Sequence, residues 1–149
     1  MALNMHQHGI NRSLILHLRK KFPEARVDLK YDGYVIPDKR PLILIEPLIN
    51  VNESETKQRQ SIEVSHHYQI GLFDANSVQL SINQERLANV FNFDRIIYYD
   101  TLKTPIEQAG SFLCVLNDIT PIFSDDLTKK SEFYRVYFDV EIINTKRSR

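Results

Sequence analysis

Two adjacent histidines, His66 and His67, lie in the stretch IEVSHHYQIGLFD, and imidazoles can bind a metal or transfer a proton. Apolar and polar residues alternate from Ser61 to Phe73, which predicts a β-strand. Because consecutive strand side chains point to opposite faces, the two imidazoles cannot easily hold one metal together. We therefore expect His66 to be a core or interface histidine with a satisfied ring nitrogen. We expect His67 to be solvated or to contact another subunit, where its titration would make assembly sensitive to mild acid.

Other candidate ligands and nucleophiles are isolated in the sequence. His6 and His8 share one side of an extended MHQHG segment and can supply two metal ligands. No third ligand is indicated, so we predict no metal site. Cys114 alternates with Phe112 and Leu116 in an apolar segment, which favours a small packed hydrophobe over a reactive thiolate.

Charged clusters offer little chemistry either. The pairs Asp125-Asp126 and Asp28-Asp32 lie near predicted turns, where aspartate bonds to local backbone. The basic clusters at 19–21 and 146–149 can contact phosphates, but a solvated helix end and a chain terminus explain them equally well. The chain has only four glycines and contains no GxSxG elbow, HExxH helix or phosphate-binding loop. We predict a protein that is not an enzyme and binds no cofactor.

Length and composition predict one domain over residues 1–149, with flexible termini at 1–8 and 145–149. Nineteen basic and nineteen acidic side chains cancel, so no overall field attracts nucleic acid or a membrane. The single cysteine excludes an intrachain disulfide. Polar residues interrupt the first twenty positions, and no apolar run approaches the roughly 18 residues of a membrane span. We expect a soluble protein made in the cytoplasm.

The first half of the chain predicts a helix followed by strands. Apolar residues recur every four positions from Ile10 to Phe22, with Asn11 or Ser13 as the cap and Pro23 after the basic last turn. RVDLKYDGYVIP predicts a hairpin around Asp32-Gly33. PLILIEP predicts a strand at 41–47 that is buried on both faces and is central or covered, and the polar stretch 50–60 predicts an exposed loop or hairpin tip.

The second half alternates one helix with strands. A helix is predicted from Ser77 to Phe93, with Ser81 and Gln84 resembling a capping box. Further predicted strands cover 95–100, 111–119 and 132–144, and a loop covers 124–130. The two longest strands have thirteen residues and span about 43 Å at roughly 3.3 Å per residue. They must cross the whole domain, bend, or project as a hairpin arm.

This order of elements predicts the fold class. Two helices separated by runs of strands favour an α+β domain, with both helices on one face of a largely antiparallel sheet.

A characteristic order of segments runs along the chain: the basic amphipathic first helix, the strand PLILIEPLI, the charged loop ETKQRQ leading into SIEVSHHYQIGLFD, the helix ending ERLANVFNF, and the closing strand EFYRVYFDVEII. Over nearly the whole chain it resembles the tail terminator and related tail-completion proteins of long-tailed bacteriophages. The resemblance implies a structural α+β subunit of the virion that assembles into a ring, usually hexameric, on the last ring of the tail tube. Such a ring stops tube polymerisation, offers a surface to the neck of the filled head, and surrounds DNA in its lumen.

The resemblance also implies assembly surfaces and partners. The implied partners are other copies of the chain, the tail tube protein and a head-to-tail connector protein. The expected contact surfaces are His67 and two charged loops, with solvated loops as the alternative, and the loops carry Glu53, Glu55, Lys57, Arg59, Asp125, Asp126, Lys129 and Lys130. Two other functions remain open: a head-completion or neck connector protein on the portal side, and a small cytosolic ligand-binding module or enzyme with a pocket around His66 and Tyr68.

Overall fold

The computed structural model describes residues 4–48, 50–54, 61–122 and 134–147. Its elements are, in chain order, α1 (Gln7–Lys21), β1 (Arg26–Leu29), β2 (Leu42–Pro47), β3 (Val51–Ser54), β4 (Ser61–Asp74), α2 (Ser77–Phe93), β5 (Arg95–Asp100), β6 (Glu107–Leu113), β7 (Val115–Ile122) and β8 (Tyr134–Arg147). The predicted strand at 61–73 and the predicted helix at 77–93 are confirmed, and β5 has the predicted bounds.

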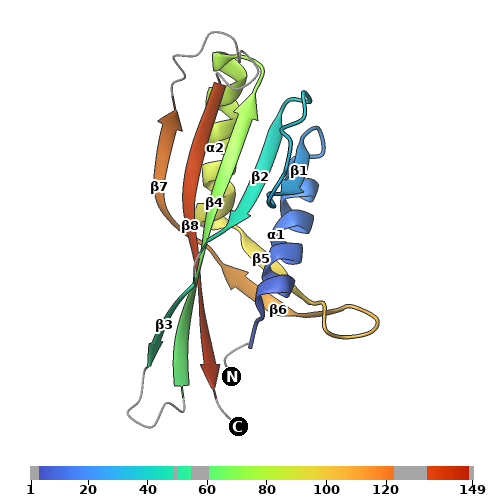
Figure 1. Cartoon of the computed structure of the whole chain (residues 1–149), viewed down its shortest axis with the longest axis vertical. Helices are drawn as coiled ribbons and strands as arrows, with labels where there is room; N and C mark the ends of the chain where they lie inside the picture. Colours follow the sequence, from blue (N-terminus) through green and yellow to red (C-terminus); the bar gives the residue numbers. More distant parts are fainter. Residues whose placement is uncertain (1–3, 49, 55–60, 123–133, 148–149) are drawn as a thin grey trace.

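The described strands form two sheets (Figure 1). The larger sheet has the order β1-β2-β4-β8-β7, with β3 paired to β4, and the smaller sheet contains β5 and β6. All of these pairings are antiparallel except that of β1 with β2. The chain therefore has the predicted α+β fold with a largely antiparallel, mixed sheet.

Both helices pack against one face of the larger sheet, which we call the core face. α1 presents Ile10, Leu14 and Leu18 at intervals of four, and α2 presents Leu87, Val90 and Phe91. The even-numbered residues of the two long strands meet these side chains, and the buried set includes Tyr68, Ile70, Leu72, Val136, Phe138 and Val140. The alternation of the strands and the fourfold spacing of α1 thus place one apolar surface against another.

Both helices begin at caps other than the predicted ones. The ring of His6 accepts a hydrogen bond from Gly9 N, so α1 starts one turn before the predicted Ile10, and neither Asn11 nor Ser13 is the cap. Asn76 Oδ1 accepts from Gln79 N at 2.9 Å, so Asn76 caps α2 and the Ser81–Gln84 capping box is wrong. In each case the side chain satisfies a backbone N–H that the first helical turn leaves without a partner.

The predicted hairpin at 26–37 is wrong, although its turn exists. Gly33 has φ +80°, and Tyr34 N donates to Tyr31 O at 3.0 Å, as Asp32-Gly33 predicted. The chain then runs on to β2, which pairs with β1 in parallel. The segment after the turn instead covers the far end of the sheet, where Tyr34 and Ile36 pack on Leu42, Leu44 and Phe73.

Three other predicted segments differ from the structure or lie outside it. Residues 51–54 form strand β3, so the predicted loop at 50–60 is wrong for that part. The predicted strand at 111–119 is divided at Cys114 between β6 and β7, which belong to different sheets. The predicted loop at 124–130 lies outside the described residues. The predicted central strand is confirmed, because Leu42 to Ile45 are all buried and β2 lies between β1 and β4.

The two long strands extend beyond the helices as an arm (Figure 1). We define the arm as β3, residues 61–65 of β4 and residues 143–147 of β8, which pair in the order β3, β4, β8. The register of β4 on β8 runs without interruption from Ser61 opposite Arg147 to Asp74 opposite Tyr134. Of the three predicted possibilities for the long strands, the structure shows projection.

The N-terminal segment is packed where flexibility was predicted. Met5 is buried, and its backbone N–H and carbonyl both bond the side chain of Asn144. Gln7 begins α1, which His6 caps, and β8 continues to Arg147; flexibility of the termini stays a prediction. Among the described residues, no helix has the length and apolar character needed to cross a bilayer.

Candidate functional site

A buried polar network surrounds His66 at the start of α1. Gln7 Oε1 accepts from His66 Nδ1 at 2.9 Å, which gives His66 the Nδ1–H tautomer. The Gln7 amide nitrogen donates to the Tyr68 hydroxyl at 2.5 Å and to Asn11 Oδ1 at 3.0 Å. Tyr68 in turn donates to Asn11 Oδ1 at 2.6 Å, and burial raises the pKa of Tyr68. His66 is therefore a core histidine with a satisfied ring nitrogen, as predicted, and it ties α1 to β4.

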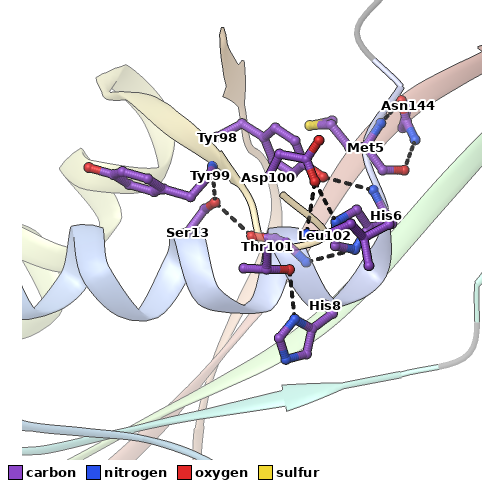
Figure 2. A network of polar contacts seen from close by, with 11 residues as sticks. Met5, His6, His8, Ser13, Tyr98, Tyr99, Asp100, Thr101, Leu102 and Asn144 are labelled. Atoms are coloured by element: carbon purple, nitrogen blue, oxygen red, sulfur yellow. Dashed lines mark hydrogen bonds and ion pairs between the residues drawn. The ribbon is translucent and has the colours of Figure 1, made fainter. Parts of the chain in front are cut away.

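A second network joins the start of α1 to the end of β5 (Figure 2). His6 Nδ1 accepts from Gly9 N at 3.1 Å, so its proton lies on Nε2, which is 3.3 Å from Asp100 Oδ1. The backbone N–H of His6 donates to the Tyr98 hydroxyl at 3.1 Å. His8 Nδ1 lies 2.7 Å from Thr101 Oγ1. The loop after β5 is thus bound to the first turn of α1.

Close packing accompanies this second network. Gly9 meets Tyr98 so closely that a Cβ at position 9 would lie 2.5 Å from the tyrosine hydroxyl. Ser13 Oγ donates to Gly9 O at 2.6 Å and accepts from Tyr99 N at 2.9 Å. Burial raises the pKa of Tyr98, which keeps its hydroxyl a neutral partner.

The His6–Asp100 pair has the form of a proton-transfer dyad, but its nitrogens are already engaged. One nitrogen caps the helix and the other faces the carboxylate. The rings of His6 and His8 stack with centroids 6.4 Å apart. Among the described residues, no group of three or more potential ligands could hold a metal ion. The arrangement works as a structural tie between α1 and β5.

Cys114 is a buried thiol at the junction of β6 and β7. It packs in the main core cluster, which confirms the predicted small hydrophobe. Burial raises the pKa of Cys114 to about 12, so the thiol stays protonated and unreactive near neutral pH.

The side of the larger sheet opposite the helices is half-buried or exposed at Gln69, Asp139 and Asp118, away from the end that Tyr34 and Ile36 cover, and we call it the open face. A groove of about 550 Å³ lies on it, lined by Leu48, His67, Gln69, Thr120, Tyr137, Phe138 and Asp139. Leu48 is 43% exposed, and Tyr137 is half-buried. His67 is thus separated from His66 by the pleat, as predicted, and lies in a groove with an aromatic and an aliphatic wall.

Acidic side chains lie across the open face. The strand register aligns Glu46, Gln69, Asp139 and Asp118 in one row, and it places His67 opposite Glu141 in the next. Asp118 and Asp139 lie directly opposite each other, and like charges in that position destabilise a sheet. Lys30 pairs with Glu46 at 3.5 Å, whereas the ion pairs within the described ranges do not include Asp118, Asp139 or Glu141.

The predicted interface residues fall into two groups. Glu53 belongs to β3 in the arm, and His67 lines the groove, so the structure separates them along β4. The other predicted interface residues lie outside the described residues: Glu55, Lys57, Arg59, Asp125, Asp126, Lys129 and Lys130. Sequence reasoning missed the acidic row. The alternation of β8 shows that Asp139 and Glu141 share a face, but it does not show which strands pair with β8 and which residues lie beside these two.

Comparison with known proteins assigns no family. No protein-family model matches the chain, and no curated protein matches its sequence. The similarity to phage tail terminators therefore stays a prediction, and surfaces of the molecule must support any functional proposal.

Proposed function

We propose that the protein is a structural virion subunit that forms a ring at the end of the tail tube of a long-tailed bacteriophage. The ring terminates tube polymerisation and joins the tail to the head. The single observation that carries this proposal is the arm, in which β4 and β8 continue past the helices with β3 at their side.

The arm offers an edge on which another chain can add a strand. β7 pairs with β8 only between Arg135 and Glu141, so from Ile142 to Arg147 the outer edge of β8 faces no described strand. Such an edge presents free N–H and C=O groups, which bind an extended segment of a partner. Ile143 in this stretch is 46% exposed.

A ring also requires two different surfaces on each subunit. A contact between unlike surfaces leaves a partner site free at each end, and a suitable rotation closes the chain of copies into a ring. The arm edge is one surface of this kind. The tail tube protein and the neck connector bind the two ends of the ring, and DNA passes through its lumen.

A charged residue on the arm edge tests the proposal. We expect Ile143→Lys to abolish the ring and leave the fold unchanged, because lysine on an edge strand opposes strand addition. Ile97→Lys is the matched control, since Ile97 is also an exposed strand isoleucine, at 39%, but lies in the β5–β6 sheet. Native mass spectrometry measures the oligomer, and circular dichroism checks the fold. Retention of the ring by Ile143→Lys would remove the observation that carries the proposal.

Particles made without the protein distinguish the two sides of the junction. Loss of a tail terminator leaves overlong tubes or unjoined tails, whereas loss of a head-side connector leaves heads that leak DNA. Electron microscopy of the resulting lysate separates these outcomes.

A further inference from the structure

We infer that neighbouring copies contact each other through two unlike surfaces: the outer surface of α1 on one copy and the open face of the sheet on the next. The inference rests on the proposed ring and names a pair of surfaces within it. Its evidence is a separation of charge between the two sides of the molecule.

α1 is basic on its outer surface. Its sequence, QHGINRSLILHLRKK, contains no acidic residue. Arg12, Arg19 and Lys20 are exposed, and the ion pairs found among the described residues include none of them. The Arg19 guanidinium donates to a backbone carbonyl, that of Val27, at 3.1 Å.

The open face carries carboxylates on β8 and β7, and its cations Lys30 and Arg135 lie nearer the other end of the sheet, beside Glu46 and Phe73. Asp118 and Asp139 are exposed and Glu141 is half-buried. Asp118 lies opposite Asp139 next to a register shift. Within the described part of the chain, the Asp118 carboxylate accepts only from neutral donors, Ile119 N at 2.9 Å and Thr120 Oγ1 at 3.5 Å. A cation placed between the two carboxylates would therefore lower their repulsion. Since α1 packs on the core face, the basic surface and the acidic residues belong to different sides of the larger sheet. We therefore expect neighbouring copies to meet head to tail.

The two surfaces also match in size and polarity. Arg12 and Lys20 are eight residues apart, which is about 12 Å along a helix at 1.5 Å per residue. Asp118 and Asp139 lie on neighbouring strands, roughly 5 Å apart, and Asp139 and Glu141 are two residues apart on β8, or roughly 7 Å. Glu46 lies about 10 Å from Asp139, on the other side of β4.

An apolar centre completes the match. Leu16 is half-buried and lies one turn from both Arg12 and Lys20, and the groove between the carboxylates contains Leu48 and Tyr137. An apolar centre inside a charged rim is the usual anatomy of a protein interface. A second copy fits this groove better than DNA does, because Asp139 lines it and Asp118 and Glu141 lie beside Asp139 in the sheet.

Reciprocal charge reversal tests the contact. One variant carries Asp139→Lys and Glu141→Lys, and the other carries Arg12→Glu and Lys20→Glu. Each variant alone would bring like charges together, so we expect the concentration at the midpoint of assembly to rise by at least about 100-fold. Mixing the two restores opposite charges at every contact, so we expect assemblies of equal composition in native mass spectrometry.

The control is a reversal of the same size elsewhere. Glu85→Lys with Glu107→Lys changes two exposed carboxylates on α2 and β6 and should leave assembly within about twofold of wild type. High salt should weaken wild-type assembly, since the screening length falls from about 10 Å at 0.1 M to about 3 Å at 1 M.

The outcomes separate this inference from the proposed ring. If the wild type forms rings and either variant alone forms them equally well, or mixing restores nothing, the contact is wrong and the ring stands. If reversal on α1 abolishes binding to duplex DNA and leaves the rings intact, the basic surface binds DNA instead. If the wild type stays monomeric with and without tail tubes, both proposals fail.

Discussion

The two faces of the larger sheet are made from alternate residues of the same strands, yet only one is covered by helices. On the core face Tyr68 and Phe138 are fully buried, whereas on the open face Gln69 and Asp139 are their immediate neighbours in sequence. Along β4 or β8, one side chain therefore points into the core and stabilises the fold, and the next points to the open face and is available for contact. Stability and assembly should respond to mutation with a period of two residues.

Truncation on the core face should have the largest effect. Phe138→Ala removes a fully buried ring that packs edge-on against Phe91, with centroids 5.9 Å apart. We expect the free energy of unfolding to fall by about 3–5 kcal/mol. The matched variant Asp139→Ala should change it by less than about 1 kcal/mol. Urea unfolding followed by circular dichroism measures both, and equal losses would contradict the division between faces.

The adjacent residues His66 and His67 allow the same comparison between the two faces, with a smaller expected loss of stability. His66→Ala removes a buried ring and one of the two donors to Gln7 Oε1, which keeps the hydrogen bond from Asn50 Nδ2, and should lower the free energy of unfolding by about 1–3 kcal/mol. His67→Ala should change it by less than about 0.5 kcal/mol, because His67 lies in the open groove. Thermal unfolding of the two variants side by side would refute the assignment if His67→Ala were the more damaging.

The buried thiol of Cys114 should make the stability of the core depend on pH. Its folded pKa of about 12 lies above the unfolded value, so the folded state holds a proton that the unfolded state has released at alkaline pH. Stability is fully present below the unfolded pKa and falls as pH rises towards 12, by up to about 1.4 kcal/mol per pH unit. Cys114→Ala should reduce this slope, with the buried tyrosines retaining part of it. Denaturant unfolding between pH 7 and 11 measures the slope, and an unchanged slope in the variant would contradict the burial of the thiol.

The smallest effect should be a gain in stability on the open face. Asp139→Asn removes one of two opposed carboxylates and should raise the free energy of unfolding by about 0.2–1 kcal/mol. The same change should weaken assembly, since it removes a contact charge. A variant that becomes more stable and also assembles better would mean that the acidic row does not bind a neighbour.

Local patterns predicted much of this molecule. Alternation located β4 and the division between His66 and His67, because a pleated strand decides the direction of each side chain by itself. The fourfold apolar spacing likewise identified the buried side of α1. These features depend on neighbours a few residues apart.

The features that the sequence did not predict depend on distant partners. His6 caps α1 with its ring held near Asp100, 94 residues away. β1 pairs in parallel with β2, although its turn residues favoured a hairpin, and the opposition of Asp118 to Asp139 requires the register of β7 on β8. The projecting arm was one of three predicted outcomes for the two long strands. The choice among them depends on the pairing of β4 with β3 and β8.

We propose that this protein forms a ring that ends a tail tube. The most direct measurement is electron microscopy of tail tubes polymerised in the presence of the purified protein. We expect one ring on one end of each tube and tubes that stop growing. Tubes that elongate unchanged, with bare ends and the protein monomeric in solution, would contradict it.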